Sequence, residues 1–360
     1  MPDTTTGDGS GCAKYLESSN SHTASFAEIV LEPYNYLIGN VKKELRSELI
    51  SALNHWMNVP PAPIKAIAEV IRMLHNSSLI IDDIEDGSLL RRGKPAAHCI
   101  FGTPSSINSA NYVYFLALQK VIELERPDAV TIFTEQMLEL HIGQGMELFW
   151  RHSFRCPTEE EYFAMALRKT SGLFALAFRL MQLFSENKEN YKPLVDTLGL
   201  LFQIRDDYVN LVDKSYQKSK AFAEDITEGK FSFPIVRSIQ ANPRDNQVMS
   251  ILCQRTTDNY LKVHCVRHMA ELGAFDYTVD VMAKLEQQCH ALIEHHGGNP
   301  LLSAFLKKVS SIYRLNDGQL RRHSASEFDF NPESEQATPV ESSKLPCSLT
   351  PNGPLKPSSS

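Results

Sequence analysis

Four acidic side chains stand close together where a strongly apolar segment ends, in residues 79–86, which read LIIDDIED. Asp82 and Asp86 are four residues apart, so on a helix they share one face, one turn apart. Like charges at that spacing repel unless a cation lies between them, and Mg²⁺ prefers carboxylate oxygens, usually together with a substrate phosphate. The spacing predicts a magnesium site or, as the plain alternative, a solvated acidic helix end.

A second acidic segment repeats this spacing 124 residues further along the chain. Asp206 and Asn210 again lie one helical turn apart, with Asp207 between them, at the end of another apolar run. Two such segments predict two walls of one cavity, an arrangement that helical bundles use to hold metal. A di-iron centre would need Glu-x-x-His motifs, and no glutamate in the chain is followed three residues later by histidine.

Basic side chains lie near both acidic segments in the sequence. If a metal bridges carboxylates to a phosphate, cations are expected to bind the remaining phosphate charge, arginine through paired hydrogen bonds and lysine as a compact charge. Taken alone, each candidate reads more readily as a surface charge or, for the histidine, as a structural side chain. The candidates are Lys43, Arg46, His75, Arg91, Arg92, Lys169 with Thr170, Lys220 and Lys230.

The elements that must position these groups are predicted to be helices. Prolines stand mostly between the apolar segments, where helices end. The pattern predicts an all-α single domain of ten or more helices, without strand periodicity. Apolar residues recur at spacings of three and four in residues 64–84, 129–150, 160–184, 194–211 and 277–293.

The composition of the 360-residue chain excludes several classes of protein. Its 36 basic and 43 acidic side chains give a formal net charge of −7, which argues against a general nucleic-acid binder. No apolar run approaches the roughly 18 residues of a membrane-spanning helix, and the polar N-terminus does not resemble a signal peptide, so a cytoplasmic protein is expected. The seven cysteines include no C-x-x-C pair, which argues against a structural zinc site.

Both ends of the chain differ from the helical block. Residues 1–24 are rich in Thr, Ser, Gly and Asn without apolar periodicity, and residues 323–360 are rich in Ser and Pro. Segments of such composition cannot bury enough apolar surface to offset the entropy lost on ordering. We therefore expect a disordered arm at 1–24, one domain at 25–322 and a disordered tail at 323–360.

From about Phe26 to Arg321 the chain resembles geranylgeranyl diphosphate synthases of the animal and fungal type, within the trans-prenyltransferase family. The resemblance implies an isoprenoid-synthase helical bundle around a deep central cavity, usually a homodimer. It also implies an enzyme that condenses isopentenyl diphosphate head to tail with dimethylallyl, geranyl and farnesyl diphosphates to give a C20 diphosphate. It rests on these stretches, in family-like order and spacing: LEPYNYL, MLHNSSLIIDDIEDGSLLRRG, SINSANYVYF, PTEEEY, LFQIRDDYVNL and EDITEGKFSFP.

The resemblance also implies roles for individual residues. The metal and basic residues would make the allylic diphosphate a leaving group, and the alkene of isopentenyl diphosphate would attack the resulting carbocation without a protein nucleophile. The residues implied to bind about three Mg²⁺ ions are Asp82, Asp86 and Asp206, with Asp83 and Asp207 in support. Those implied to hold isopentenyl diphosphate are Lys43, Arg46, His75 and Arg92. Those implied to hold the allylic diphosphate are Arg91, Lys169, Thr170, Gln203, Asn210, Lys220 and Lys230.

Product length is expected to depend on the residues one turn before the first acidic segment, where the hydrocarbon must pass. Ser77 and Ser78 are small, which leaves the channel open beyond fifteen carbons, whereas farnesyl-producing relatives carry aromatic side chains there. The resemblance places the floor of the channel at Tyr114, Phe115 and His141, although the two aromatic residues are equally typical of core packing. These residues predict a C20 product.

Other functions stay open beside this one. Farnesyl diphosphate synthase would make a shorter product with the same residues. A terpene cyclase usually carries N/D-D-x-x-S/T-x-x-x-E as its second metal motif, which residues 206–214 do not match in either register, and a non-catalytic regulatory subunit typically lacks one aspartate motif. The long polar tail points toward specialised diterpene biosynthesis, and a housekeeping supply of the C20 diphosphate for protein prenylation and quinones stays open beside it.

Two positions near the site depart from many relatives. Val41 and Lys42 precede Lys43 where relatives have Pro-Gly, so Lys42 competes for the same role. Glu147 replaces an aspartate, which lengthens the side chain by one methylene and keeps its charge. Neither change removes a group that the chemistry needs.

Overall fold

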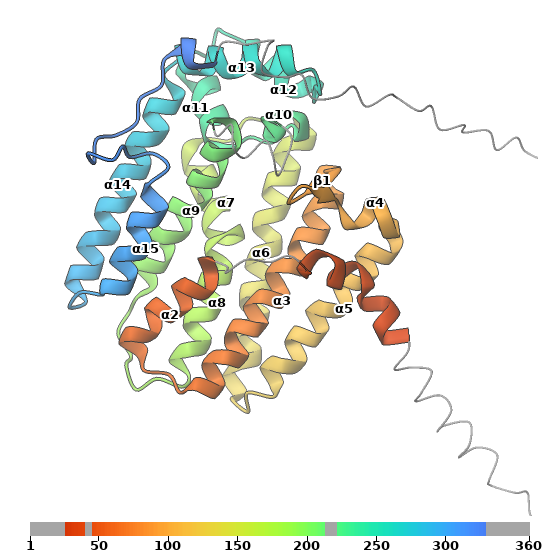
Figure 1. The fold of residues 1–360 in the computed structure, drawn as a ribbon, viewed down its shortest axis with the longest axis vertical. Coiled ribbons are helices and arrows are strands. Elements are labelled where there is room, and N and C mark those ends of the chain that lie inside the picture. The colour runs from red at the N-terminus through yellow and green to blue at the C-terminus, as the bar shows by residue number, and fades with distance from the viewer. Residues whose placement is uncertain (1–25, 40–44, 213–221, 329–360) are drawn as a thin grey trace, which may run out of the picture.

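Helices make up about three quarters of the residues that the structure describes. The computed structural model describes residues 26–39, 45–212 and 222–328, and the all-α prediction is confirmed. In Figure 1, α3 runs through the middle, with α4 and α5 on one side and α14 and α15 on the other. A helix over residues 26–38 precedes α2 (Leu45–Met57), α3 (Pro61–Asp86), α4 (Ala97–Phe101), α5 (Thr103–Ile122), α6 (Pro127–Ser153), α7 (Glu159–Lys169), α8 (Ser171–Gln182), α9 (Lys192–Val212), α10 (Glu224–Glu228), α11 (Phe233–Ala241), α12 (Gln247–Gln254), α13 (Asn259–Glu271), α14 (Ala274–His295), α15 (Pro300–Ser310) and the 3₁₀ turn η2 (Ala325–Phe328).

α3 carries the first acidic segment at its C-terminal end. Proline lies in its first turn, where the missing N–H is not needed, and Gly87 ends it with a left-handed φ of 68°. Ile67, Ile71 and Leu74 are buried, and the helix packs against α5 and α8. This packing fixes the place at which Asp82 and Asp86 leave the core.

α9 carries the second acidic segment and lies unusually close to α8. A Cβ atom at Gly199 would stand 1.8 Å from the Ser171 Oγ and 2.8 Å from its Cα, so only glycine fits at this contact. α9 also packs against α7 and α14. The close approach brings Asp206 and the start of α8 to the same side of the bundle.

The apolar segment at residues 160–184 is two helices and not one, which corrects the sequence prediction. α7 ends at Lys169 and α8 begins at Ser171, with Thr170 between them. The Thr170 hydroxyl donates a hydrogen bond to the Gln203 Oε1 of α9. Periodicity continues across the break, but this contact and the redirected chain place Lys169 and Thr170 at the cavity described below.

A short hairpin follows α3, although the sequence shows no strand periodicity. Strands β1 (Leu90–Arg91) and β2 (Lys94–Pro95) pair antiparallel, with Arg91 opposite Lys94. Arg92 and Gly93 form the turn with positive φ angles of 55° and 75°. Strands of two residues are too short to produce a pattern, but the turn places Arg91 and Arg92 beside the end of α3.

The packed domain extends to Phe328, six residues beyond the boundary predicted at 322. The His323 ring lies 2.5 Å from the Tyr208 hydroxyl, and the Phe328 ring packs on Phe275 with centroids 5.3 Å apart. The Ser-rich composition of residues 323–360 does not reveal that His323 and Phe328 pack against the domain. The arm at 1–24 and residues 329–360 lie outside the described residues, and no described helix has the length and apolarity to span a membrane.

Candidate active site

A cavity of about 460 Å³ lies between α3, α5, α6, α8 and α9, with α10 at its polar end. One part of its wall is charged and the other is apolar. The acidic lining residues are Asp82, Glu85, Asp86, Asp206, Asp225 and Glu228. The basic lining residues are Arg46, His75, Arg91, Arg92, Lys169, Arg205 and Lys230, and Thr170, Gln203 and Asn210 add polar groups. The structure thus brings the two acidic segments together, as their shared spacing predicts.

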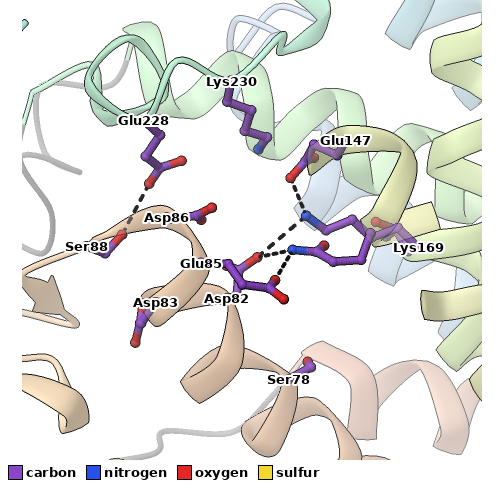
Figure 2. A network of polar contacts seen from close by, with 12 residues as sticks. Ser78, Asp82, Asp83, Glu85, Asp86, Ser88, Glu147, Lys169, Glu228 and Lys230 are labelled. Carbon is purple, nitrogen blue, oxygen red and sulfur yellow. Dashed lines mark hydrogen bonds and ion pairs between the residues drawn. The ribbon is translucent and has the colours of Figure 1, made fainter. Parts of the chain in front are cut away.

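The two neighbouring aspartates of the first segment point in different directions. Asp82 lines the cavity, whereas Asp83 is 1% exposed and lies on the opposite side of the α3 ribbon in Figure 2. The Arg91 Nε donates to Asp83 Oδ1 at 2.7 Å, and an Arg91 nitrogen lies 3.5 Å from Asp82. Asp83 therefore holds the arginine and does not itself face the cavity.

The second segment likewise has one aspartate in the cavity wall and one that is buried behind it. Asp206 is exposed to the cavity, whereas Asp207 is buried. Asp207 accepts hydrogen bonds from the Tyr162 hydroxyl at 2.5 Å and from the backbone N–H of Phe233 at 2.9 Å. Lys230 Nζ lies 3.1 Å from the same carboxylate. Asp207 thus orients groups around the site from behind its wall.

Among the residues that the structure describes, the lysines that line the cavity are Lys169 and Lys230. Lys169 Nζ lies 2.7 Å from Glu147 and 3.5 Å from Asp82. Burial works to lower the pKa of Lys169, but Glu147 and Asp82 outweigh it and the pKa lies above its ordinary value. The pKa of Lys230 is raised in the same way, since Asp207 and Asp225 outweigh its burial. Both lysines remain cationic at neutral pH.

Arg46 and His75 form a pair at the side of the cavity. The Arg46 Nη1 lies 2.9 Å from His75 Nε2, and arginine must be the donor. Burial lowers the pKa of His75 well below its ordinary value, and the charges of Arg46, Arg92 and Arg91 lower it further. His75 is therefore neutral and accepts a hydrogen bond in the protein without ligand.

The apolar part of the wall begins below Asp82. Tyr114 and His141 lie at this part, with ring centroids 6.1 Å apart. Burial, with Glu85 and Asp82 nearby, raises the pKa of Tyr114, so its hydroxyl stays neutral. The remaining apolar lining residues are Leu79, Ile81, Leu140, Leu173, Phe174 and Phe202.

Two of the residues predicted to set product length do not reach the cavity. Ser78 lines it, but Ser77 is fully buried elsewhere, because successive residues on a helix point about 100° apart. Tyr114 lines it, but the neighbouring Phe115 is 70% exposed on the outer side of α5. Lys43 and Lys220 lie outside the described residues.

One face of α6 carries three residues at the site, two of which, Gln144 and Arg151, the sequence analysis missed. Gln144, Glu147 and Arg151 are spaced at i, i+3 and i+7, and all three contact groups at the first acidic segment or Lys169. Gln144 Nε2 donates to Glu85 Oε2 at 2.7 Å. Polar residues repeated at helical spacing on one face of α6 are the pattern that would have identified them.

Glu228 of α10 was missed as well. Ser88 Oγ donates to Glu228 Oε1 at 3.3 Å, which links the end of α3 to α10 across the polar end (Figure 2). Asp225 lines the cavity beside it. Within the described residues, no group of three or more His, Cys, Asp or Glu side chains is placed to hold a metal ion by itself.

Comparison with known proteins gives consistent matches. The family profile described as Polyprenyl synthetase matches residues 27–269. A terpene synthase of Matsumurasca onukii is 49% identical over 291 residues, which cover 81% of this chain and 96% of that protein. A geranylgeranyl pyrophosphate synthase of Mucor circinelloides f. lusitanicus is 47% identical over 294 residues, covering 81% and 97%. Another from Metarhizium anisopliae is 47% identical over 289 residues, covering 80% and 87%.

The depressed pKa of His75 predicts a loss of stability in acid. Above the unfolded-state pKa of about 6.5 both states are neutral at this position; below it the unfolded chain takes up the proton first. The free energy of unfolding should therefore fall as pH decreases from 7.5 to 5.5, with a His75 contribution approaching about 1.4 kcal/mol per pH unit. Chemical denaturation of the ligand-free protein at a series of pH values measures this free energy of unfolding.

His75→Gln keeps an acceptor for Arg46 and should flatten this pH dependence. His290→Gln, at an exposed position on α14, should not. If the free energy of unfolding varied with pH in the same way in the wild type and in His75→Gln, His75 would not be the source of the pH dependence.

Proposed function

The chain belongs to the polyprenyl synthetase family, and from this premise we propose that it is a geranylgeranyl diphosphate synthase. It is a trans-prenyltransferase that joins isopentenyl diphosphate to allylic diphosphates. The observation that carries the proposal is a single cavity with two acidic segments and two sets of basic groups at one end and an apolar wall at the other. A substrate with a diphosphate head and a hydrocarbon tail matches this division.

The polar end suits a divalent metal, which we propose to be Mg²⁺, about three ions per site. Asp82, Asp86 and Asp206 present carboxylate oxygens to one cavity from two helices, which is the ligand type that Mg²⁺ prefers. Because no group of described side chains is placed to hold a metal alone, substrate phosphate oxygens would complete the shell. When bound, the metal would neutralise negative charge on the departing diphosphate.

Lys169, Lys230 and Arg91 are the proposed cations for the allylic diphosphate, together with Lys220. Lys169 and Lys230 remain protonated because neighbouring carboxylates raise their pKa values. The Thr170 hydroxyl, bonded to Gln203, and the Asn210 amide add polar contacts on the same side. These groups bind the diphosphate more strongly as negative charge builds on it, which lowers the barrier to breaking its bond to carbon.

Arg46, His75 and Arg92 form the proposed site for the second diphosphate, that of isopentenyl diphosphate, together with Lys43. They line the cavity from α2, α3 and the hairpin, apart from the Lys169 and Thr170 side. Neutral His75 accepts from Arg46 and so leaves the arginine its full charge. A second bound diphosphate would favour proton uptake by His75, which would add a further donor.

The reaction that this arrangement supports has three steps. The carbon–oxygen bond of the allylic diphosphate breaks, and diphosphate leaves with the electron pair. The terminal alkene carbon of isopentenyl diphosphate then forms a bond to the allylic carbon, which moves the positive charge to the neighbouring carbon of the alkene. Loss of a proton restores a double bond, and the departed diphosphate is a sufficient base, so no side-chain base is assigned.

Product analysis tests the proposal. Purified protein with Mg²⁺, isopentenyl diphosphate and each of the C5, C10 and C15 allylic diphosphates should release an acyclic C20 diphosphate. Asp82→Asn, which removes a metal-binding charge and keeps the shape of the side chain, should lower turnover at least about 100-fold. Chromatography of the dephosphorylated products identifies the chain length.

The other outcomes point to specific alternatives. One similar protein is named terpene synthase, and a hydrocarbon product would place this chain with that activity. A product that stops at C15 would make it a farnesyl diphosphate synthase. A folded protein without turnover would indicate a regulatory subunit. The separate cationic group at Arg46, His75 and Arg92 favours condensation, because a cyclase binds only one diphosphate.

Ser78 is the proposed position at which the wall can shorten the product. It lies one helical turn before Asp82 and lines the cavity, whereas an aromatic ring there would fill the space that the tail needs. Ser78→Phe should shift the main product from C20 to C15 with turnover of the C5 substrate retained. Ser78→Ala should keep the C20 product, and an unchanged product in Ser78→Phe would contradict the assignment.

We also propose that two copies of the chain associate through α5 and α6. These helices pack against each other and expose large apolar side chains at spacings of eight and seven residues on α5 and of four and seven residues on α6. Contiguous exposed apolar side chains often mark an interface between chains. The side chains are Ile107, Phe115 and Ile122 on α5 and Leu138, Ile142 and Phe149 on α6.

Two charges on this surface should separate the copies. The double variant Leu138→Glu, Ile142→Glu should sediment as a monomer, because burying two carboxylates against an apolar partner is costly. Leu301→Glu, at an exposed position on α15, should sediment like the wild type. A wild-type protein that is monomeric at about 10 µM would overturn this part of the proposal.

A further inference from the structure

Arg151 is a fully buried cation that lies outside the cavity wall. Its side chain is 1% exposed, and it is absent from the residues that line the cavity. It projects from α6 toward the end of α3, where its Nη1 donates to Asp86 Oδ1 at 2.5 Å and its Nη2 donates to the Glu85 carbonyl at 2.7 Å. One guanidinium thus donates hydrogen bonds to both a side chain and the backbone of the first acidic segment.

The backbone contact completes the end of α3. The last carbonyl groups of a helix have no partner within the helix. The N–H groups of Gly87 and Ser88 satisfy the carbonyls of Asp83 and Ile84. Arg151 supplies the donor for the next carbonyl, that of Glu85, and its positive charge complements the negative end of the helix dipole.

The side-chain contact balances a concentration of negative charge. Burial raises the pKa of Asp86, as do the neighbouring carboxylates Asp82, Glu228 and Glu147, while Lys169 lowers it. Burial works to lower the pKa of Arg151, but the adjoining Asp86 carboxylate outweighs it and the pKa is raised. A cation that a substrate cannot reach can remain on Asp86 while cavity cations such as Lys169 turn toward a diphosphate.

We infer that Arg151 is a positioning residue, which holds one oxygen of Asp86 and the last turn of α3 so that the carboxylate faces the cavity in one orientation. This inference deepens the proposed function and rests on its assignment of Asp86 to the metal. Lysine would keep the charge but cannot donate to both acceptors with the same planar geometry. Partners that orient a metal ligand typically change metal affinity 10- to 100-fold when they are replaced.

Binding of Mn²⁺ in place of Mg²⁺, followed by electron paramagnetic resonance in the presence of inorganic diphosphate, tests the inference without turnover. Arg151→Lys should weaken Mn²⁺ binding about 10-fold, and Arg151→Gln about 100-fold. Arg155→Gln is the matched control, because it removes an exposed ion pair with Glu161 just beyond the same helix. It should leave the affinity unchanged.

A double variant separates positioning from general loss of structure. If Arg151 acts through Asp86, then Arg151→Lys should cause no further loss of Mn²⁺ affinity in an Asp86→Asn background, and circular dichroism should show a folded chain. At saturating Mn²⁺, Arg151→Lys should recover most of its turnover with an unchanged KM for the allylic substrate. Wild-type affinity in Arg151→Lys, or losses that add in the double variant, would overturn the inference.

The same measurements keep this inference apart from the proposed function. A wild-type protein that binds Mn²⁺ but makes no C20 diphosphate would overturn the synthase assignment, and the Arg151 variants would still report on Asp86. A normal C20 product with Arg151→Lys indistinguishable from the wild type would overturn only the role of Arg151.

Discussion

Repulsion between carboxylates is the constraint on which the rest of this structure depends. Acidic side chains from α3, α9 and α10 face one cavity of about 460 Å³. Partly buried like charges oppose folding unless cations lie among them. The fold supplies three of these cations from outside α3, α9 and α10: the hairpin places Arg91, the junction of α7 and α8 places Lys169, and the residues after α10 place Lys230. The elements around the cavity are therefore arranged so that cations lie among the carboxylates.

The cations fall into two groups by what they can reach. Arg151 is bound to Asp86 behind the wall, so its contact persists whatever occupies the cavity. Lys169 instead lies in the wall, 2.7 Å from Glu147 but 3.5 Å from Asp82. In the proposed synthase, a metal held at Asp82 would neutralise that carboxylate, and Lys169 could exchange its contact with Asp82 for a phosphate oxygen. The ion pairs of the free protein would thus keep the site residues in position until the substrate replaced some of them.

Much of this architecture can be predicted from sequence, because the relevant information is local. Spacing of apolar residues predicts the helices that carry Asp82 and Asp206, and their repeated motif predicts one shared cavity. Spacing does not give the direction of a side chain relative to a partner helix, so Ser77, predicted from its place one turn before Asp82, lies outside the cavity. Phe115, which the family resemblance implied, also lies outside it. The break at Thr170 depends on a contact with α9, distant in sequence. The cytoplasmic location and the diterpene pathway stay predictions from sequence.

The proposed metal ligand Asp82 and the proposed tail-facing residue Ser78 lie on one helix, α3. Asp82 and Ser78 lie on successive turns of α3, about 6 Å apart along its axis. α3 is a continuous helix packed against α5 and α8, so this offset varies little with thermal motion. In the proposed synthase, α3 therefore fixes both the position of the reacting carbon and the position of the wall that the tail meets. Such a helix favours a narrow distribution of product lengths, and evolution can alter the dominant length by changing one wall residue without disturbing the groups that break the carbon–oxygen bond.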